Sequence, residues 1–158
     1  MRRGLCAGTS RKLACAATVG WTLFIWSRSL FAGPDSLAQS DAVVNLMRPL
    51  LVGFGVHDAN AMSFLVRKAG HVSEYLVLGL LATLACKTLS GRTAEDRGVS
   101  QGLAGLAFGL VVAVIDESIQ RFVPGRSGQA ADVLIDAAGL IAGALLVSLI
   151  ARRMARRG

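Results

Sequence analysis

Two stretches of this chain carry acidic residues directly beside long apolar runs. The stretch 115–139 holds two acid pairs, Asp116 with Glu117 and Asp132 with Asp136. A charged side chain at the centre of a membrane helix costs roughly 2.5–3.5 kcal/mol on insertion scales. A chain that places several acids there has either paired them internally or used them to build a site.

The second stretch lies upstream and adds a histidine. Lys68, His71, Glu74 and Tyr75 recur at spacings of three and four residues, which places them on one face of a helix. The chain then continues as an apolar run, so the polar stripe occupies only one end of that helix.

Clustered carboxylates with a histidine could hold a divalent cation, which would then clamp a phosphate group. A divalent cation is the cofactor that is compatible with this pattern. The candidate ligands are His71, Glu74, Asp116, Glu117, Asp132 and Asp136.

The same residue types could instead act as general acid and base, because a carboxyl group beside a histidine can transfer protons. In this interpretation the catalytic residues are Asp116, Glu117 and His71. The supporting residues are Glu74, Tyr75, Gln120, Asp132 and Asp136.

Basic residues near the acids allow a third use, the binding of an anionic headgroup without any chemistry. The candidates are Lys68, Arg121 and Arg126. The structural alternative is an ion-pair network that is satisfied within the protein and only fixes the register of its helices.

Four apolar runs approach the ~20 residues that a helix needs to cross a ~30 Å hydrocarbon core. They cover about 13–31, 70–89, 101–121 and 133–150. With 158 residues, of which 53% are apolar, the chain is predicted to be a single domain, 1–158. The expected fold is all-α, a four-helix transmembrane bundle. The outer loop that follows the first span is expected to form short interfacial helices, one of which ends at Pro49.

Basic residues predict the orientation of this bundle. Eleven of the seventeen precede the first run, lie at the end of the second or between the second and third, or follow the fourth. Because four spans put these segments on one side, the positive-inside rule places both termini in the cytoplasm. Eight of the ten acids then lie on the outer side, at similar depth where they fall in the spans. Topology therefore accounts for the net charge of +7, and we expect no nucleic-acid partner.

Three blocks of the sequence carry a resemblance to a known family. The first covers 24–40, and the second, 67–79, reads RKAGHVSEYLVLG. The third combines DESIQRFVPGR at 116–126 with DVLIDAAG at 132–139. Together they resemble the VanZ-like family of small bacterial membrane proteins. Asp136 departs from the family pattern, in which asparagine is commoner, and its extra negative charge favours a cation or a protonated carboxyl there.

The resemblance implies a role more than a mechanism. The family takes its name from a protein linked to low-level resistance to teicoplanin, a lipoglycopeptide that acts at the outer face of the bacterial membrane. We therefore expect a multi-pass protein of the bacterial cytoplasmic membrane. Its outward-facing site would bind membrane lipid or another anionic lipid-linked or glycopeptide ligand and, in an enzyme, process it. The alternative is a non-enzymatic scaffold whose polar residues only fix helix packing.

Overall fold

The chain folds into five α-helices, as seen in a computed structural model that describes residues 2–31, 33–89, 97–126 and 128–157. The helices are α1 (Arg2–Ser29), α2 (Gly33–Gly53), α3 (Ala59–Leu89), α4 (Arg97–Phe122) and α5 (Ala130–Ala155). These described segments contain no strand, which confirms the predicted all-α class. Arg92, one of the basic residues behind the predicted orientation, lies outside them.

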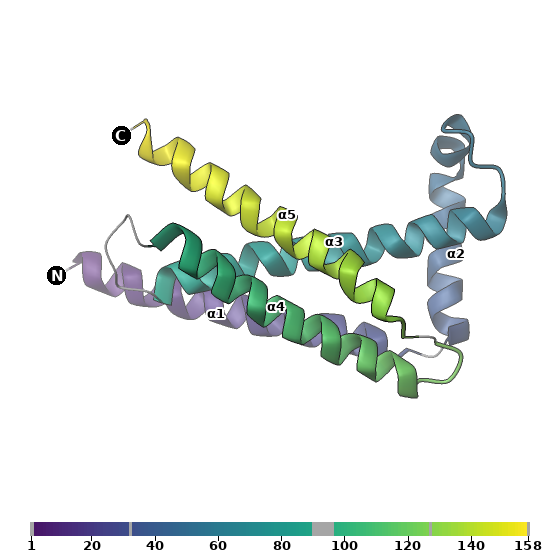
Figure 1. Ribbon diagram of the computed structural model, residues 1–158, viewed down its shortest axis with the longest axis horizontal. Helices are drawn as coiled ribbons and strands as arrows, with labels where there is room; N and C mark the ends of the chain where they lie inside the picture. Colours follow the sequence, from purple (N-terminus) through teal and green to yellow (C-terminus); the bar gives the residue numbers. More distant parts are fainter. Residues whose placement is uncertain (1, 32, 90–96, 127, 158) are drawn as a thin grey trace.

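Four helices run side by side and one lies across their end (Figure 1). The central helix is α3, which contacts each of the others and packs most extensively against α5. The contact between α1 and α4 is the smallest in this group. In the described chain α2 packs against α3 alone, at the end of the molecule opposite the start of α1 and the end of α5.

Three of the described helices are long and apolar enough to cross a membrane. These segments are Ala59–Lys87, Gly102–Phe122 and Ala130–Ala155, and they overlap the second, third and fourth predicted spans. Their outer faces expose large apolar side chains such as Leu103 and Leu134, as lipid-facing helices do. The first predicted span runs alongside them within α1, and its crossing stays a prediction.

The closest helix contact, between α3 and α5, depends on glycine. A Cβ added to Gly79 would lie 2.9 Å from the Cα of Leu140, and one added to Gly139 would lie 2.5 Å from the carbonyl oxygen of Val72. One added to Gly143 would lie 2.8 Å from the backbone nitrogen of Leu80 in α3. Small residues at these points let two backbones approach in a membrane protein.

The predicted short helices of the outer loop are wrong in one respect. The segment after α1 is one continuous helix of 21 residues, and it runs through Pro49 instead of ending there. The residue before a proline has only a bias against helical backbone, and the helix overrides that bias here. Gly55, at a φ of 82°, then turns the chain towards α3.

The start of α3 is fixed by a side-chain cap. The carboxylate of Asp58 accepts a 2.7 Å hydrogen bond from the backbone N–H of Ala61, which satisfies one of the free donors in the first turn. Met62, one turn later, is completely buried, and the hydroxyl of the next residue, Ser63, donates to Oδ1 of Asp41 in α2 at 3.4 Å. The cap and this contact together set where α3 begins, 12 residues before His71.

Candidate functional site

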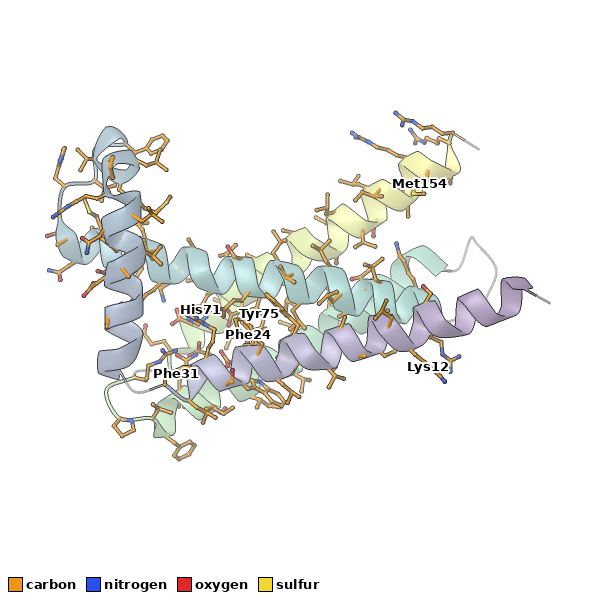
Figure 2. All side chains as sticks on the ribbon, turned by 180° about the vertical axis from the view of Figure 1, so that it is seen from behind. Lys12, Phe24, Phe31, His71, Tyr75 and Met154 are labelled. Carbon is orange, nitrogen blue, oxygen red and sulfur yellow. The ribbon has the colours of Figure 1, made fainter. Side chains whose placement is uncertain are left out.

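Polar side chains from α1, α3, α4 and α5 meet inside the bundle, towards the end that α2 covers. Figure 2 shows His71 and Tyr75 on the side of α3 that faces the other helices. The structure therefore brings the predicted catalytic and supporting residues into one group with one addition from α1. We call it the polar cluster, consisting of Ser29, His71, Glu74, Tyr75, Asp116, Glu117, Gln120, Asp132 and Asp136.

The last turns of α4 supply the centre of the cluster. Asp116, Glu117 and Gln120 are at most 4% exposed. Their spacing of three and four residues puts them on one face, and the amide nitrogen of Gln120 lies 3.1 Å from Oδ2 of Asp116 and 3.3 Å from Oε1 of Glu117. One neutral donor is thus shared between two carboxylates.

The end of α1 contributes Ser29, which is 3% exposed. Its hydroxyl donates a 2.6 Å hydrogen bond to Oδ1 of Asp116, and Gln120 donates to the same hydroxyl at 3.3 Å. Trp26, one turn earlier, donates its indole N–H to the carbonyl of Val112 at 3.4 Å. These bonds hold α1 against the polar end of α4.

Two pairs connect α3 to α5 within the cluster. Lys68 forms an ion pair with Asp132, which lies in the first turn of α5. Nδ1 of His71 lies 3.2 Å from Oδ1 of Asp136, which is completely buried. Asp132 and Asp136 lie four residues apart on one face of α5, and their partners lie three residues apart on one face of α3.

A third pair connects α3 to α1. Oε1 of Glu74 lies 2.9 Å from Nε of Arg28, whose side chain is 44% exposed. The indole N–H of Trp21 donates a 2.9 Å hydrogen bond to the carbonyl of Glu74. Glu74 therefore forms contacts with α1 through both its side chain and its backbone carbonyl.

The connection between α4 and α5 folds back over Glu117. The backbone N–H of Gln129 donates a 2.9 Å hydrogen bond to Oε2 of Glu117. A Cβ at Gly128 would lie 2.9 Å from Cγ of Arg121 and would also meet the carbonyl of Glu117, so the close approach requires glycine. Glu117 thus receives donors on both of its oxygens.

Two buried polar atoms of the cluster have no hydrogen-bond partner in the described part of the chain. They are Oδ2 of Asp136 and the hydroxyl of Tyr75, and both residues are 0% exposed. Buried polar groups are nearly always hydrogen-bonded, so each exception needs an explanation. A ligand among these side chains would supply one.

The geometry narrows the set of candidate metal ligands. Ligand atoms of His71, Asp116 and Glu117 all lie within 4.8 Å of one another. Glu74 and Asp132 already have a basic partner. The described residues therefore offer one three-residue group that could hold a cation, drawn from α3 and α4.

The three predicted anion-binding residues differ in how exposed they are and in which residues lie near them. Lys68 is engaged by Asp132, and the side chain of Arg121 is exposed at the end of α4. Arg126 is partly buried in the connection after α4. Burial lowers the pKa of its guanidinium, while nearby Asp116 and Glu117 act in the opposite direction. An arginine stays charged under such influences, so Arg126 places a cation beside the cluster.

Sequence reasoning missed Arg28 and Ser29 as members of the site. The signal was present, because both lie in a polar group at the end of an apolar run. Ser73, the nearest hydroxyl to His71 along the chain, is exposed and donates to the carbonyl of Ala69 instead. It is not part of the polar cluster.

A comparison with known proteins identifies a family. A model of the family described as VanZ/LLP1 matches residues 14–151. This range includes every member of the polar cluster, two of the described apolar helices in full, and the third, Ala130–Ala155, as far as residue 151. No curated protein and no solved structure matches the chain. The family match covers most of the chain, which therefore belongs to the VanZ/LLP1 family.

Proposed function

We propose that this protein spans the bacterial cytoplasmic membrane four times, with both termini in the cytoplasm. Its polar cluster would face the outer leaflet and bind the headgroup of an anionic envelope lipid. α2 would then lie along the outer membrane surface, across the end of the bundle. Lower sensitivity to teicoplanin is the expected phenotype, because that antibiotic acts at the same face of the membrane.

The observation that carries this proposal is the number of buried acids relative to their partners. Among the contacts described, Glu74 and Asp132 form ion pairs with Arg28 and Lys68, and Arg126 adds its charge beside Asp116 and Glu117. The bonds described for Asp116, Glu117 and Asp136 come from neutral donors and from His71. Ionisable side chains inside a membrane bundle are expensive, and by default they indicate a functional site.

The unpartnered atoms support a binding site more than a scaffold. A network that only fixed helix register would satisfy its own members. Oδ2 of Asp136 and the hydroxyl of Tyr75 remain without partners among the described residues. A headgroup with both donors and acceptors would complete them.

Helix geometry supports a position near the outer leaflet. Sixteen residues separate His71 from Lys87 on α3, and the same number separates Asp136 from Arg152 on α5. At 1.5 Å per residue, each interval is about 24 Å long. With the basic ends at the cytoplasmic boundary of a ~30 Å core, both residues lie in its outermost quarter.

An apolar groove beside the cluster supports a lipid as the ligand. It lies between α1 and α4 and has a volume of about 340 Å³. Its lining consists of Val19, Thr22, Leu23, Trp26, Phe108, Val111, Val112 and Ile115. Trp26 is one helical turn from Ser29, and Ile115 immediately precedes Asp116. A molecule with a polar head and an acyl chain would match both surfaces.

Charge at the edge of the cluster favours an anionic headgroup. Arg121 is exposed, and the side chains of Arg28 and Arg126 are each partly accessible. Arginine is well suited to phosphate, because its planar group can donate two parallel hydrogen bonds. These residues would meet the anion while the acids held its donors or a bound cation.

The test is teicoplanin susceptibility of a sensitive bacterial host. The host would carry the wild type, His71→Ala, Glu117→Gln or an empty vector, with membrane levels of each protein matched. The control is His57→Ala, which removes the other histidine of the chain from an exposed position. We expect protection by the wild type and the control, and loss of protection in both cluster variants.

Protection by all variants at equal abundance would contradict the proposal and favour the scaffold. Thermal unfolding in detergent separates the two readings further. A scaffold predicts that Glu117→Gln lowers the melting temperature, because it removes a member of the network. A site of crowded carboxylates predicts no loss or a gain, because binding sites sacrifice stability for function.

A further inference from the structure

We propose that His71, Asp116 and Glu117 bind one divalent metal ion of the Zn²⁺ or Mn²⁺ type. The inference rests on the proposed headgroup site and deepens it, since the ion would supply the positive charge that a phosphate group meets. It assigns the three central residues to the ion and the surrounding polar side chains to their support.

The first argument is the separation of the donor atoms. They lie within 4.8 Å of one another and come from two helices. Nitrogen and carboxylate oxygen bind zinc at about 2.0–2.2 Å, so two ligands of one ion can lie up to about 4.4 Å apart. Side-chain rotation would have to close any distance between donors that exceeds this limit. Asp116 and Glu117 are adjacent on α4, and His71 faces them from α3.

The second argument is the bond behind His71. Its Nδ1 is engaged by Oδ1 of Asp136 at 3.2 Å, which leaves Nε2 as the ligand atom. A histidine that binds a metal almost always donates its other N–H to a carboxylate, a carbonyl or water, and this fixes the ring. The fully buried Asp136 occupies that position, and its Oδ2 has no described partner.

The carboxylates are oriented in the same way. Ser29 and Gln120 donate to the two oxygens of Asp116 at 2.6 Å and 3.1 Å. Gln120 and the backbone N–H of Gln129 donate to the two oxygens of Glu117 at 3.3 Å and 2.9 Å. A carboxylate has about four lone-pair sites, so each retains acceptor capacity for an ion.

Charge and donor chemistry determine the class of ion. Three acids, Asp116, Glu117 and Asp136, lie around one histidine, with Arg126 as a nearby cation, and a divalent ion would offset the negative charge that remains. Imidazole nitrogen suits zinc and related transition metals, and carboxylate oxygen suits manganese and magnesium. One nitrogen and two oxygens together favour zinc or manganese over calcium, which prefers oxygen alone.

The experiment measures metal bound to the full-length protein in detergent. The protein would carry an affinity tag without histidine, be treated with a chelator, and then be loaded with Zn²⁺ or Mn²⁺ alone. Elemental analysis after removal of free metal should give about one ion per chain for the wild type. The melting temperature should rise with the concentration of the added ion.

The variants locate the site. His71→Ala and Asp116→Asn should each lower bound metal at least ten-fold, and Glu117→Gln is a third variant that retains the size of the side chain. His57→Ala and Asp41→Asn should bind as much as the wild type. Asp41→Asn is the matched control for the acids, because it removes an exposed carboxylate of α2 that lies outside the polar cluster.

A wild type that binds neither ion, or ligand variants that bind as much as the wild type, would overturn the metal site. The teicoplanin test separates this failure from failure of the proposed function. Protection that requires His71 without bound metal would leave a metal-free headgroup site. Bound metal without any protection would leave a metal site and remove the proposed role.

Discussion

Ser29 of α1 donates its hydroxyl to Asp116 of α4 across a distance of 2.6 Å, and the two side chains are 3% and 1% exposed. The bond reaches across 87 residues of sequence. Through this bond α1 forms one side of the polar cluster, although its composition is that of a simple membrane anchor. Side-chain and backbone contacts of this kind between helices lead to specific expectations for single substitutions.

Ser29→Ala should lower the stability of the bundle, whereas Ser27→Ala should not. The first change leaves a buried oxygen of Asp116 with one donor fewer, and an unsatisfied buried group costs about 1–3 kcal/mol. Ser27 is exposed and bonds only to the carbonyl of Phe24 in its own helix. Thermal unfolding of both variants in the same detergent checks the difference, and equal melting temperatures would contradict the role of Ser29.

Lys68→Met should destabilise the protein more than the double variant Lys68→Met/Asp132→Asn. The side chains of this pair are 20% and 10% exposed, so removal of the lysine leaves a mostly buried carboxylate without its cation. Breaking a buried pair on one side costs about 3–5 kcal/mol, and replacing both partners can be nearly neutral. Unfolding of the two single variants and the double variant forms the cycle. Additive effects would show that the pair is not coupled.

Gly79→Ala should be destabilising and Gly70→Ala neutral or stabilising, although both residues lie in α3. A Cβ at position 79 would meet the backbone of Leu140, and overpacking costs typically about 1–3 kcal/mol. A Cβ at position 70 would meet nothing within 4 Å, and alanine is the better helix former by up to about 1 kcal/mol. Melting temperatures that shift equally would rule out a close α3–α5 contact at Gly79.

Asp136→Asn should retain more function than Asp136→Ala. Asparagine keeps an oxygen that can accept from Nδ1 of His71, whereas alanine leaves the ring without its support. If the histidine binds metal, the alanine variant should lose affinity by about 10–100-fold. Metal titration and teicoplanin susceptibility give two independent measurements. Equal behaviour of both variants would show that His71 does not need this partner.

Single cysteines should report the proposed orientation. In a variant without native cysteines, Pro124→Cys lies in the connection after α4 and Arg156→Cys follows α5. A maleimide that cannot cross membranes should label position 124 in intact cells and position 156 only after permeabilisation. The reverse pattern would place the polar cluster on the cytoplasmic side and contradict the proposed role.

The level of the site along the bundle could be predicted from sequence, because successive helices joined by short connections alternate in direction. One end each of α3, α4 and α5 then lies at the same end of the bundle, so His71, Asp116 and Asp136 fall at one level. Their sharing of a single cluster follows once the bundle is compact. The spacing of the apolar runs was sufficient for this part of the fold, and the orientation that charge predicts stays a prediction.

The rotation of α1 could not be predicted in the same way. Ser27 and Ser29 are two residues apart, which turns them about 200° around a helix with 3.6 residues per turn. One consequently faces outward and the other faces Asp116. A single polar group at the end of an apolar run does not indicate which of its members points inward.

Which charged side chains pair with one another also could not be predicted from the sequence. Lys68 was expected to meet an anionic ligand, but Asp132 engages it within the protein. Arg28 could have extended to the lipid headgroups, but it pairs with Glu74. The first outcome depends on the distance between α3 and α5, which glycines such as Gly139 set. The second depends on how α1 packs against α3, and no local pattern reveals either contact.

The contrast between two helix contacts has a consequence for how a ligand arrives. α3 and α5 are held together by two polar pairs at one end and, further along, by close backbone contacts at glycines. α1 and α4 share a smaller contact, which the hydrogen bonds of Ser29 and Trp26 hold at its polar end, and an apolar groove lies beside it. Separating α3 from α5 would break both polar pairs and the glycine contacts at once. For the proposed lipid ligand, this contrast favours entry from the bilayer between α1 and α4, with Ser29 as a buried polar group that its headgroup would reach.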